Sequence, residues 1–96
     1  MIPLFFYIYE EPVSATLLVD ETLVEAVKLE FRITAKMKAQ DNVFRMRIVS
    51  TKTAICNWII NLTEYIRIET TSDPSIIELL CYRARCIIEL YQKAQK

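Results

Sequence analysis

The sequence predicts an α+β domain: a two-layer sandwich in which helices cover one face of a mostly antiparallel sheet, in the order β-β-α-β-β-α-α. Three observations lead to this fold class. Alternating apolar and polar residues, many of them β-branched, fill much of the first half of the chain. Apolar residues at helical spacing follow over residues 52–68 and 75–93. The 96 residues contain no low-complexity linker, so we expect a single domain over residues 1–96.

The first third of the chain contains two strand-like segments and one short helix. Residues 4–10 are aromatic and β-branched, which favours a strand that pairs either within the chain or with a neighbouring chain. Residues 13–19 alternate in polarity and predict a second strand, although a helix is an alternative there. Asp20 is placed to cap a helix over residues 21–30. The residues of that helix at helical spacing are Leu23, Ala26, Val27 and Glu30.

Residues 32–49 predict a β-hairpin. Basic or polar residues alternate with apolar ones on both sides of Asp41 and Asn42, and these two residues can form a tight turn without glycine. One face of the hairpin is then apolar and the other is basic. The predicted register places these residues opposite one another: Met37 and Met46, Ala35 and Ile48, Ala39 and Phe44, Lys38 and Arg45, and Lys36 and Arg47.

A helix is predicted over residues 52–68, with Thr51 or Thr53 as its N-cap. Its apolar stripe is Ile55, Trp58, Ile59, Leu62, Tyr65 and Ile66. Ile60 and Ile68 point away from that stripe, while the two aromatic residues lie at its edge. Aromatic residues at the edge of an apolar stripe are typical anchors of protein interfaces.

A last helix is predicted over residues 75–93, with Ser72 or Asp73 as its N-cap. This helix is apolar over more than half of its circumference. One stripe contains Ile77, Leu80, Cys81, Ala84, Ile87, Ile88 and Tyr91, and a second face adds Leu79, Tyr82, Cys86 and Leu90. This helix could pack between the sheet and the preceding helix, but an apolar content of 53% favours contact with a partner. The candidate partner-binding residues are Trp58, Ile60, Tyr65, Ile68, Leu79, Tyr82 and Leu90.

Basic residues gather in the middle of a chain that is neutral as a whole. Residues 32–52 hold six Lys or Arg and a single acid, Asp41. The basic face of the hairpin could simply be solvated. It could also bind nucleic-acid phosphates, which would relieve the repulsion between like charges that face each other. The candidate nucleic-acid-binding residues are Arg32, Lys36, Lys38, Arg45 and Arg47.

The chain contains no glycine and no histidine. Phosphate-binding loops need glycine, and the commonest general bases and zinc sites use histidine. The three cysteines lack metal-ligand spacing, and we expect them to fill the core. We therefore expect no catalytic residues, no metal and no cofactor. The apolar N-terminus has neither the length of a membrane span nor a basic start, so we expect a cytoplasmic protein without membrane contact.

Residues 13–68 resemble the small dimerisation subunit of the KEOPS complex, a family built from a strand, a helix, a hairpin and a helix. The resemblance is carried by four short motifs: Ala26-Val27-Lys28-Leu29-Glu30, Ile48-Val49-Ser50, Ala54-Ile55 and Tyr65-Ile66. The chain departs from the family pattern at Cys56 and Ile60, where the family has Arg and Asn.

The resemblance implies a non-catalytic subunit of a tRNA-modifying complex, one that makes threonylcarbamoyladenosine. Such a subunit forms a homodimer, or a heterodimer with a paralogue, docks on the larger catalytic subunit and helps to hold tRNA. Two alternatives remain from the residues alone. One is a stand-alone nucleic-acid-binding protein that uses the basic hairpin face, and the other is a structural homo-oligomer.

Overall fold

The computed structural model describes residues 11–94, and the strand expected over residues 4–10 lies outside this range. The chain is an α+β fold with one four-stranded antiparallel sheet, as the sequence predicts. A short 3₁₀ turn, η1 (Glu21–Leu23), precedes the first helix. The other elements are β1 (Pro12–Asp20), α2 (Val24–Phe31), β2 (Met37–Gln40), β3 (Val43–Thr51), α3 (Lys52–Asn61), β4 (Ile66–Thr71) and α4 (Ser75–Ala94).

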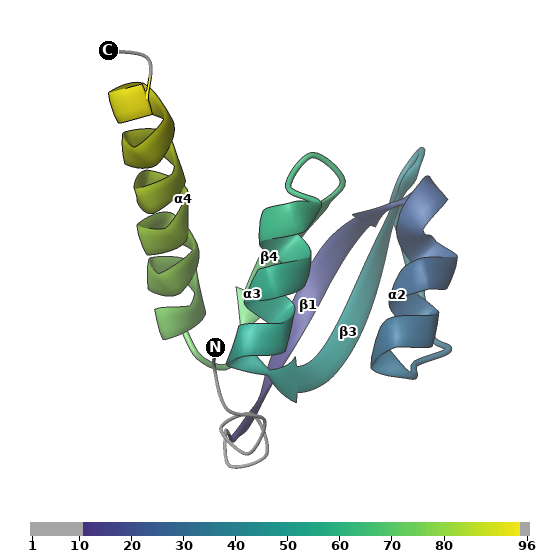
Figure 1. Cartoon of the computed structure of the whole chain (residues 1–96). Coiled ribbons are helices and arrows are strands. Elements are labelled where there is room, and N and C mark those ends of the chain that lie inside the picture. Colours follow the sequence, from purple (N-terminus) through teal and green to yellow (C-terminus); the bar gives the residue numbers. More distant parts are fainter. Residues whose placement is uncertain (1–10, 95–96) are drawn as a thin grey trace.

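The sheet has the strand order β2-β3-β1-β4, and helices α2 and α3 lie against one of its faces (Figure 1). The core fills the space between these two layers. Helix α4 stands beside α3, not over the sheet. The buried side chains of the core are Ala15, Leu17, Val19, Val24, Val27, Met46, Ile48, Ile55, Cys56, Ile59, Ile66 and Ile76.

Strand β1 is the central element, and its prediction as a strand is confirmed. It pairs with β3 along its whole length and with β4 from Ala15 to Val19. Its apolar residues Ala15, Leu17 and Val19 are buried beneath the helices, whereas Thr16 and Leu18 face the other side. The two-residue period of the sequence therefore places successive side chains of β1 on the inner and the outer face of the sheet.

Asp20 caps the first helical segment as predicted, because its carboxylate accepts a hydrogen bond from the backbone N–H of Thr22. Hydrogen bonds from Thr22 hold the pKa of Asp20 below its usual range. The α-helix itself starts only after the 3₁₀ turn, at Val24. This change of helical phase buries Val24 and Val27 and leaves Ala26 exposed, so the predicted stripe is partly wrong.

The hairpin turn is at Asp41 and Asn42 as predicted, but its register is wrong. The strand β2 is short, and a bulge between Lys38 and Gln40 shifts the pairing by one residue. Met37 consequently faces Arg45, and Lys38 faces Phe44. A shift of one residue exchanges the two faces of a strand, so Lys38 leaves the outer face that Arg45 occupies.

The helix predicted over residues 52–68 ends at Asn61. Thr51 caps it as predicted, by accepting a hydrogen bond from the backbone N–H of Ala54. The chain then turns and forms β4, in which Ile66 and Ile68 alternate with Arg67. A strand forms here because the free edge of β1 offers backbone partners and because the alternation turns both isoleucines to the core side, where Ile66 is buried and Ile68 is half-buried.

We expect the two faces of β3 to respond differently to truncation. Ile48 is fully buried, and Ile48→Ala should lower the free energy of unfolding by about 2–5 kcal/mol because it leaves a cavity. The neighbouring Val49 is 60% exposed on the opposite face, and Val49→Ala should cost less than about 1 kcal/mol. Urea denaturation measures both, and equal losses would contradict this assignment of faces.

Candidate functional site

Helix α4 begins at a well-formed cap. The carboxylate of Asp73 accepts hydrogen bonds from the backbone N–H and the hydroxyl of Ser75, at 3.0 and 2.7 Å. These bonds hold the pKa of Asp73 below its usual range. Lys52, in the first turn of α3, donates to the Ser75 hydroxyl at 2.9 Å and lies 3.8 Å from the Asp73 carboxylate. The start of α4 is therefore fixed to the start of α3.

The first two turns of α4 are anchored to the rest of the molecule. Ile76 is fully buried, and its carbonyl oxygen accepts a hydrogen bond from the thiol of Cys56 on α3. Further along, the guanidinium of Arg83 donates to the side-chain oxygen of Asn57. Leu79 and Leu80 pack against the core and are half-buried.

Beyond Arg83 the described part of the chain gives the helix no such support. Every side chain from Ala84 to Lys93 is exposed. Large apolar residues are among them: Leu90 is 66% exposed, Tyr91 64% and Ile88 53%. Figure 1 shows this half of α4 standing clear of α3.

Contact with another protein would explain why a helix of this kind exposes apolar residues. A helical segment of about ten residues without tertiary contacts is only marginally stable in water. Large aliphatic and aromatic side chains that share one exposed surface favour burial against another protein. We call the exposed apolar residues of α4 the α4 surface: Ile77, Cys81, Tyr82, Ala84, Cys86, Ile87, Ile88, Leu90 and Tyr91.

Three of the seven predicted partner-binding residues lie on α4. Tyr82 and Leu90 are exposed and belong to the α4 surface, while Leu79 is half-buried against the core. A hydrogen bond with Cys86, together with the nearby carboxylate of Glu89, raises the pKa of Tyr82. The α4 surface therefore contains two of the predicted contacts and several that the prediction did not select.

The other four predicted residues do not form one surface. Trp58 packs edge-on against Phe31 with ring centroids 5.6 Å apart, and Ile60 is half-buried on α3. Ile68 packs against the core from β4, which corrects its placement on a helix. Tyr65 is exposed in the turn before β4. The helical spacing that grouped them is wrong because α3 ends before the last two.

The cysteines divide in the same way. Cys56 is buried in the core as expected. Cys81 and Cys86 are exposed on α4, so their expected core role is wrong. Both lie on the helix whose apolar surface the rest of the described chain leaves uncovered.

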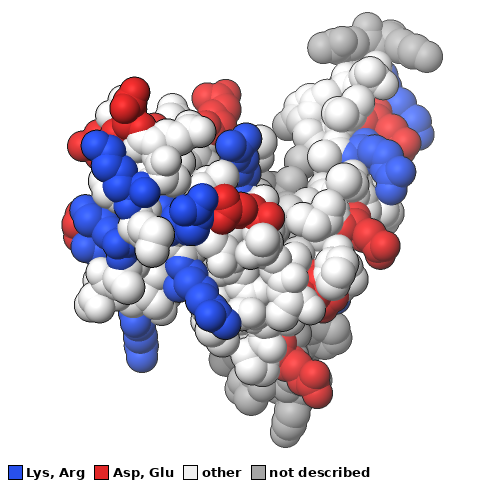
Figure 2. All heavy atoms as spheres, turned by 180° about the vertical axis from the view of Figure 1, so that it is seen from behind, with Lys and Arg blue, Asp and Glu red and all other residues white. Residues whose placement is uncertain are grey.

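The outer face of the sheet carries a second cluster, of charged residues. Arg45, Arg47 and Arg67 lie on it, from β3 and β4 on either side of β1. Arg45 forms a two-bond ion pair with Glu69, at 2.6 and 2.8 Å. Figure 2 shows this face, with Lys and Arg gathered towards the sheet edge away from α4 and an acidic side chain among them.

The basic surface predicted on the hairpin differs from the one that the structure has. Arg32 adopts a left-handed conformation where α2 ends, and the ammonium of Lys36 lies over the ring of Phe44 at 4.5 Å. Lys38 is displaced by the bulge in β2, which leaves Arg45 and Arg47 as the predicted pair that shares the outer face.

Two charged residues of this face were not among the predicted site residues. Arg67 and Glu69 lie on β4, a segment that the sequence predicts as the end of a helix and the loop after it. A register shift in the β1–β4 pairing leaves Glu69 as the extra residue between Ile68 and Thr70. Such a bulge re-aims the side chain of the inserted residue, here towards Arg45.

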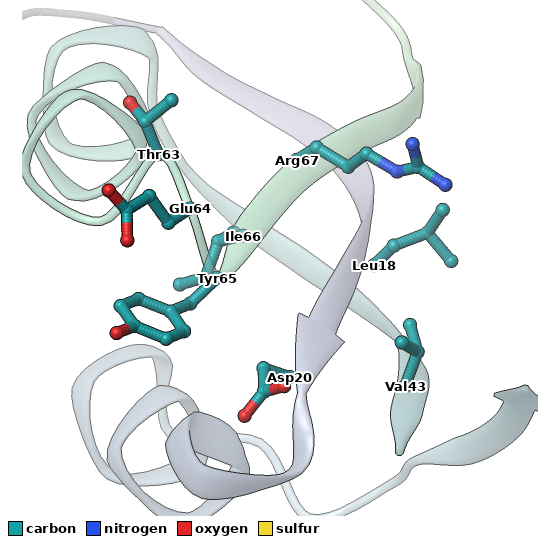
Figure 3. A pocket seen from close by; sticks show the side chains of 8 residues that line it. All are labelled: Leu18, Asp20, Val43, Thr63, Glu64, Tyr65, Ile66 and Arg67. Carbon is teal, nitrogen blue, oxygen red and sulfur yellow. The ribbon is translucent and has the colours of Figure 1, made fainter. Parts of the chain in front are cut away.

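A shallow hollow of about 330 Å³ lies where β1 ends and β4 begins. Figure 3 shows that its polar side chains diverge: Arg67 points away from Asp20, and Glu64 lies on the other side of the hollow. Asp20 is already engaged by Thr22. The lining residues therefore do not converge on one point as a substrate site requires.

In the described part of the chain, no helix has the length and apolar character that crossing a bilayer requires. Among the same residues, no three Cys, Asp or Glu side chains gather as a metal site would need. No family model matches the chain, and no curated protein or solved structure is significantly similar to it. Assignment of function therefore depends on the surfaces described above.

We expect the Arg45–Glu69 pair to make stability depend on pH. Hydrogen bonds from Arg45 hold the pKa of Glu69 below its usual range in the folded chain. The contribution of the ionised Glu69 side chain to the free energy of unfolding is therefore complete above the ordinary glutamate pKa of about 4.3. It is lost as the pH falls through the lower pKa that Glu69 has in the folded chain. Glu69→Gln should flatten the fall in urea midpoint in that acidic range.

The matched control is Glu64→Gln, which removes an exposed carboxylate in the turn before β4. This variant should keep the pH dependence of the parent chain. An acid profile for Glu69→Gln that coincides with that of the parent would contradict a contribution from the ion pair.

Proposed function

We propose that this chain is a non-catalytic assembly subunit that binds another protein chain through the α4 surface. The observation that supports the proposal best is the second half of α4, where every side chain from Ala84 to Lys93 is exposed although four of them are large and apolar. Binding of this surface would remove apolar area from water and would stabilise a helix that lacks support of its own.

The finer part of the proposal concerns the complex. The resemblance of residues 13–68 to the KEOPS dimerisation subunit supports a place in a tRNA-modifying complex. The order of elements from β1 to α3, which is strand, helix, hairpin and helix, is the order that the resemblance implies. The partners proposed on this basis are a second copy or a paralogue, and a larger catalytic subunit.

We expect the chain to be recovered in an assembly whose formation depends on the α4 surface. Tagged chain purified gently from its native cells should have a mass well above 11.3 kDa by light scattering. The double variant Ile88→Ser and Tyr91→Ser should reduce it to the monomer mass, because it removes two exposed apolar anchors without touching the core.

The control is Arg85→Ser with Glu89→Ser, which changes the polar side of α4 and leaves the net charge unchanged. This variant should assemble like the parent. A parent chain that is monomeric at high micromolar concentration, and that recovers no partner from cells, would refute the assembly role.

A second candidate function is nucleic-acid binding by the outer face of the sheet. The observation that favours it is the placement of Arg47 and Arg67 on the same face as Arg45, in a cluster where the acidic side chain of Glu69 engages Arg45. Arginine is well suited to phosphate contacts, and an uncovered sheet face is accessible to a nucleic-acid backbone.

If the outer face binds RNA, Arg47→Ala combined with Arg67→Ala should weaken binding at low salt. The slope of log affinity against log salt should fall by about 1.5, since two phosphate contacts are lost. Fluorescence anisotropy with a single-stranded RNA and with a tRNA measures this. Arg85→Ala with Lys93→Ala removes the same charge from α4 and should leave the slope unchanged, and a parent chain that binds neither RNA at low salt would refute this candidate.

A further inference from the structure

We propose that residues 1–9 of this chain, which lie outside the described residues, cover the α4 surface until a partner displaces them. The inference rests on the proposed assembly function, because it concerns how the binding surface of that function is regulated. Three observations lead to it: an uncharged stripe on α4, the place where the described chain begins, and the composition and length of the segment before it.

One side of α4 is apolar and uncharged along most of the helix. Exposed residues at alternating steps of four and three fall there within a sector of about 80°. The residues of this α4 stripe are Ile77, Cys81, Ala84, Ile88 and Tyr91. The charged residues of α4 lie outside that sector, and they are Glu78, Arg83, Arg85, Glu89 and Lys93. A charge on a covering segment would therefore be desolvated without a partner, so an uncharged apolar segment suits the stripe best.

The described chain begins beside the start of α4. The backbone N–H of Ser72 donates to the carbonyl oxygen of Ser14 at 3.0 Å, and the backbone N–H of Ser14 donates to the Ser72 hydroxyl at 3.0 Å. Ser14 follows the first described residue, Glu11, closely, and Ser72 shortly precedes Ser75, where α4 starts. Residues 1–10 are therefore attached near the end of α4 at which the stripe begins (Figure 1).

Residues 1–9 have the composition and the length that the stripe requires. Every side chain among them is that of Met, Ile, Leu, Phe, Tyr or Pro, and none carries a charge. The stripe extends about 21 Å along the helix axis from Ile77 to Tyr91. Nine extended residues reach about 30 Å, which is enough to follow it to its end. A short tether also gives the segment an effective concentration on the order of 1 mM, so weak contacts suffice to hold it.

The outer face of the sheet suits this segment less well. It carries Arg45, Arg47 and Arg67, and an uncharged segment would exclude water from these guanidinium groups without replacing it. The α4 stripe has no charge to desolvate. A partner that binds α4 must then displace the segment, and its apparent affinity falls with the fraction of chains whose stripe is open.

The first test measures hydrogen exchange in α4 of the full chain at low micromolar concentration. The variant Leu4→Ser, Phe5→Ser and Phe6→Ser makes the segment polar. We expect the amides of residues 84–93 to exchange about tenfold faster in this variant, while those of α3 keep the parent rate.

The matched control is Glu10→Gln with Glu11→Gln, which changes two neighbouring residues, keeps the apolar segment and should exchange like the parent. Circular dichroism confirms that each variant is folded. Equal exchange of α4 in the parent and in the triple-serine variant would overturn the proposal.

The second test locates the segment by cross-linking within one chain. Cys81 and Cys86 are replaced by Ser, and Leu4→Cys is then combined with Tyr91→Cys in one variant and with Ile77→Cys in another. An extended segment brings residue 4 about 23 Å along α4 from its start, level with residue 91 and about 20 Å beyond residue 77.

A short bismaleimide should therefore link residues 4 and 91 within the monomer and leave residues 4 and 77 unlinked. A segment that is not held on α4 would reach residue 77 at least as often as residue 91, because residue 77 is closer to the tether. That result would overturn the proposal. A link between two chains in place of the internal one would also overturn it, since the covering segment would then come from a second copy.

Failure of this inference is distinguishable from failure of the assembly function. If neither test finds the segment on α4, but the chain from cells is in a complex that Ile88→Ser with Tyr91→Ser abolishes, the inference fails and the assembly function holds. If the internal link forms and no complex is recovered even with the triple-serine variant, the assembly function fails, and displacement by a partner fails with it. If both hold, the triple-serine variant should enter the complex in a larger share than the parent.

Discussion

The fold depends on the central position of β1. This strand pairs with β3 on one side and β4 on the other, and its residues Ala15, Leu17 and Val19 form the middle of the core. Helices α2 and α3 can bury their apolar residues only because β1 joins the two halves of the sheet into one surface. The same strand places the half-buried side chains of Thr16 and Leu18 between the arginines of the outer face, so it also sets the spacing of the charged cluster.

Features that arise from neighbouring residues could be predicted from the sequence. The alternation of β1, the caps at Asp20, Thr51 and Asp73, and the turn at Asp41 each depend on side chains within a few residues of the backbone they contact. Their physical causes are local, and local patterns identify them. The fold class follows from the same patterns, because the apolar helices that the sequence predicts and several alternating segments have few ways to pack together.

Features that depend on distant residues could not be predicted in this way. Ile66 fits the end of a helical stripe as well as the start of a strand, and the free edge of β1 decides between them. The bulge near Lys38 moves the basic residues of β2 relative to β3, and no local pattern marks it. The ion pair between Arg45 and Glu69 joins two strands that flank β1 and follows from that topology alone. The exposed α4 surface was expected from composition, but the choice of its residues required the position of α3.

The absence of glycine, noted in the sequence, has a consequence for the unfolded state. Glycine gives an unfolded chain more conformational freedom than any other residue, and each replacement by a residue that tolerates the native backbone gains about 0.4–1 kcal/mol. Among the described residues, Arg32 is the only one with a positive φ, and the other turns use conformations that ordinary residues adopt readily. The chain therefore loses less conformational entropy when it folds. A small core beneath two short helices can hold this sheet together partly because the unfolded chain that competes with it is already restricted.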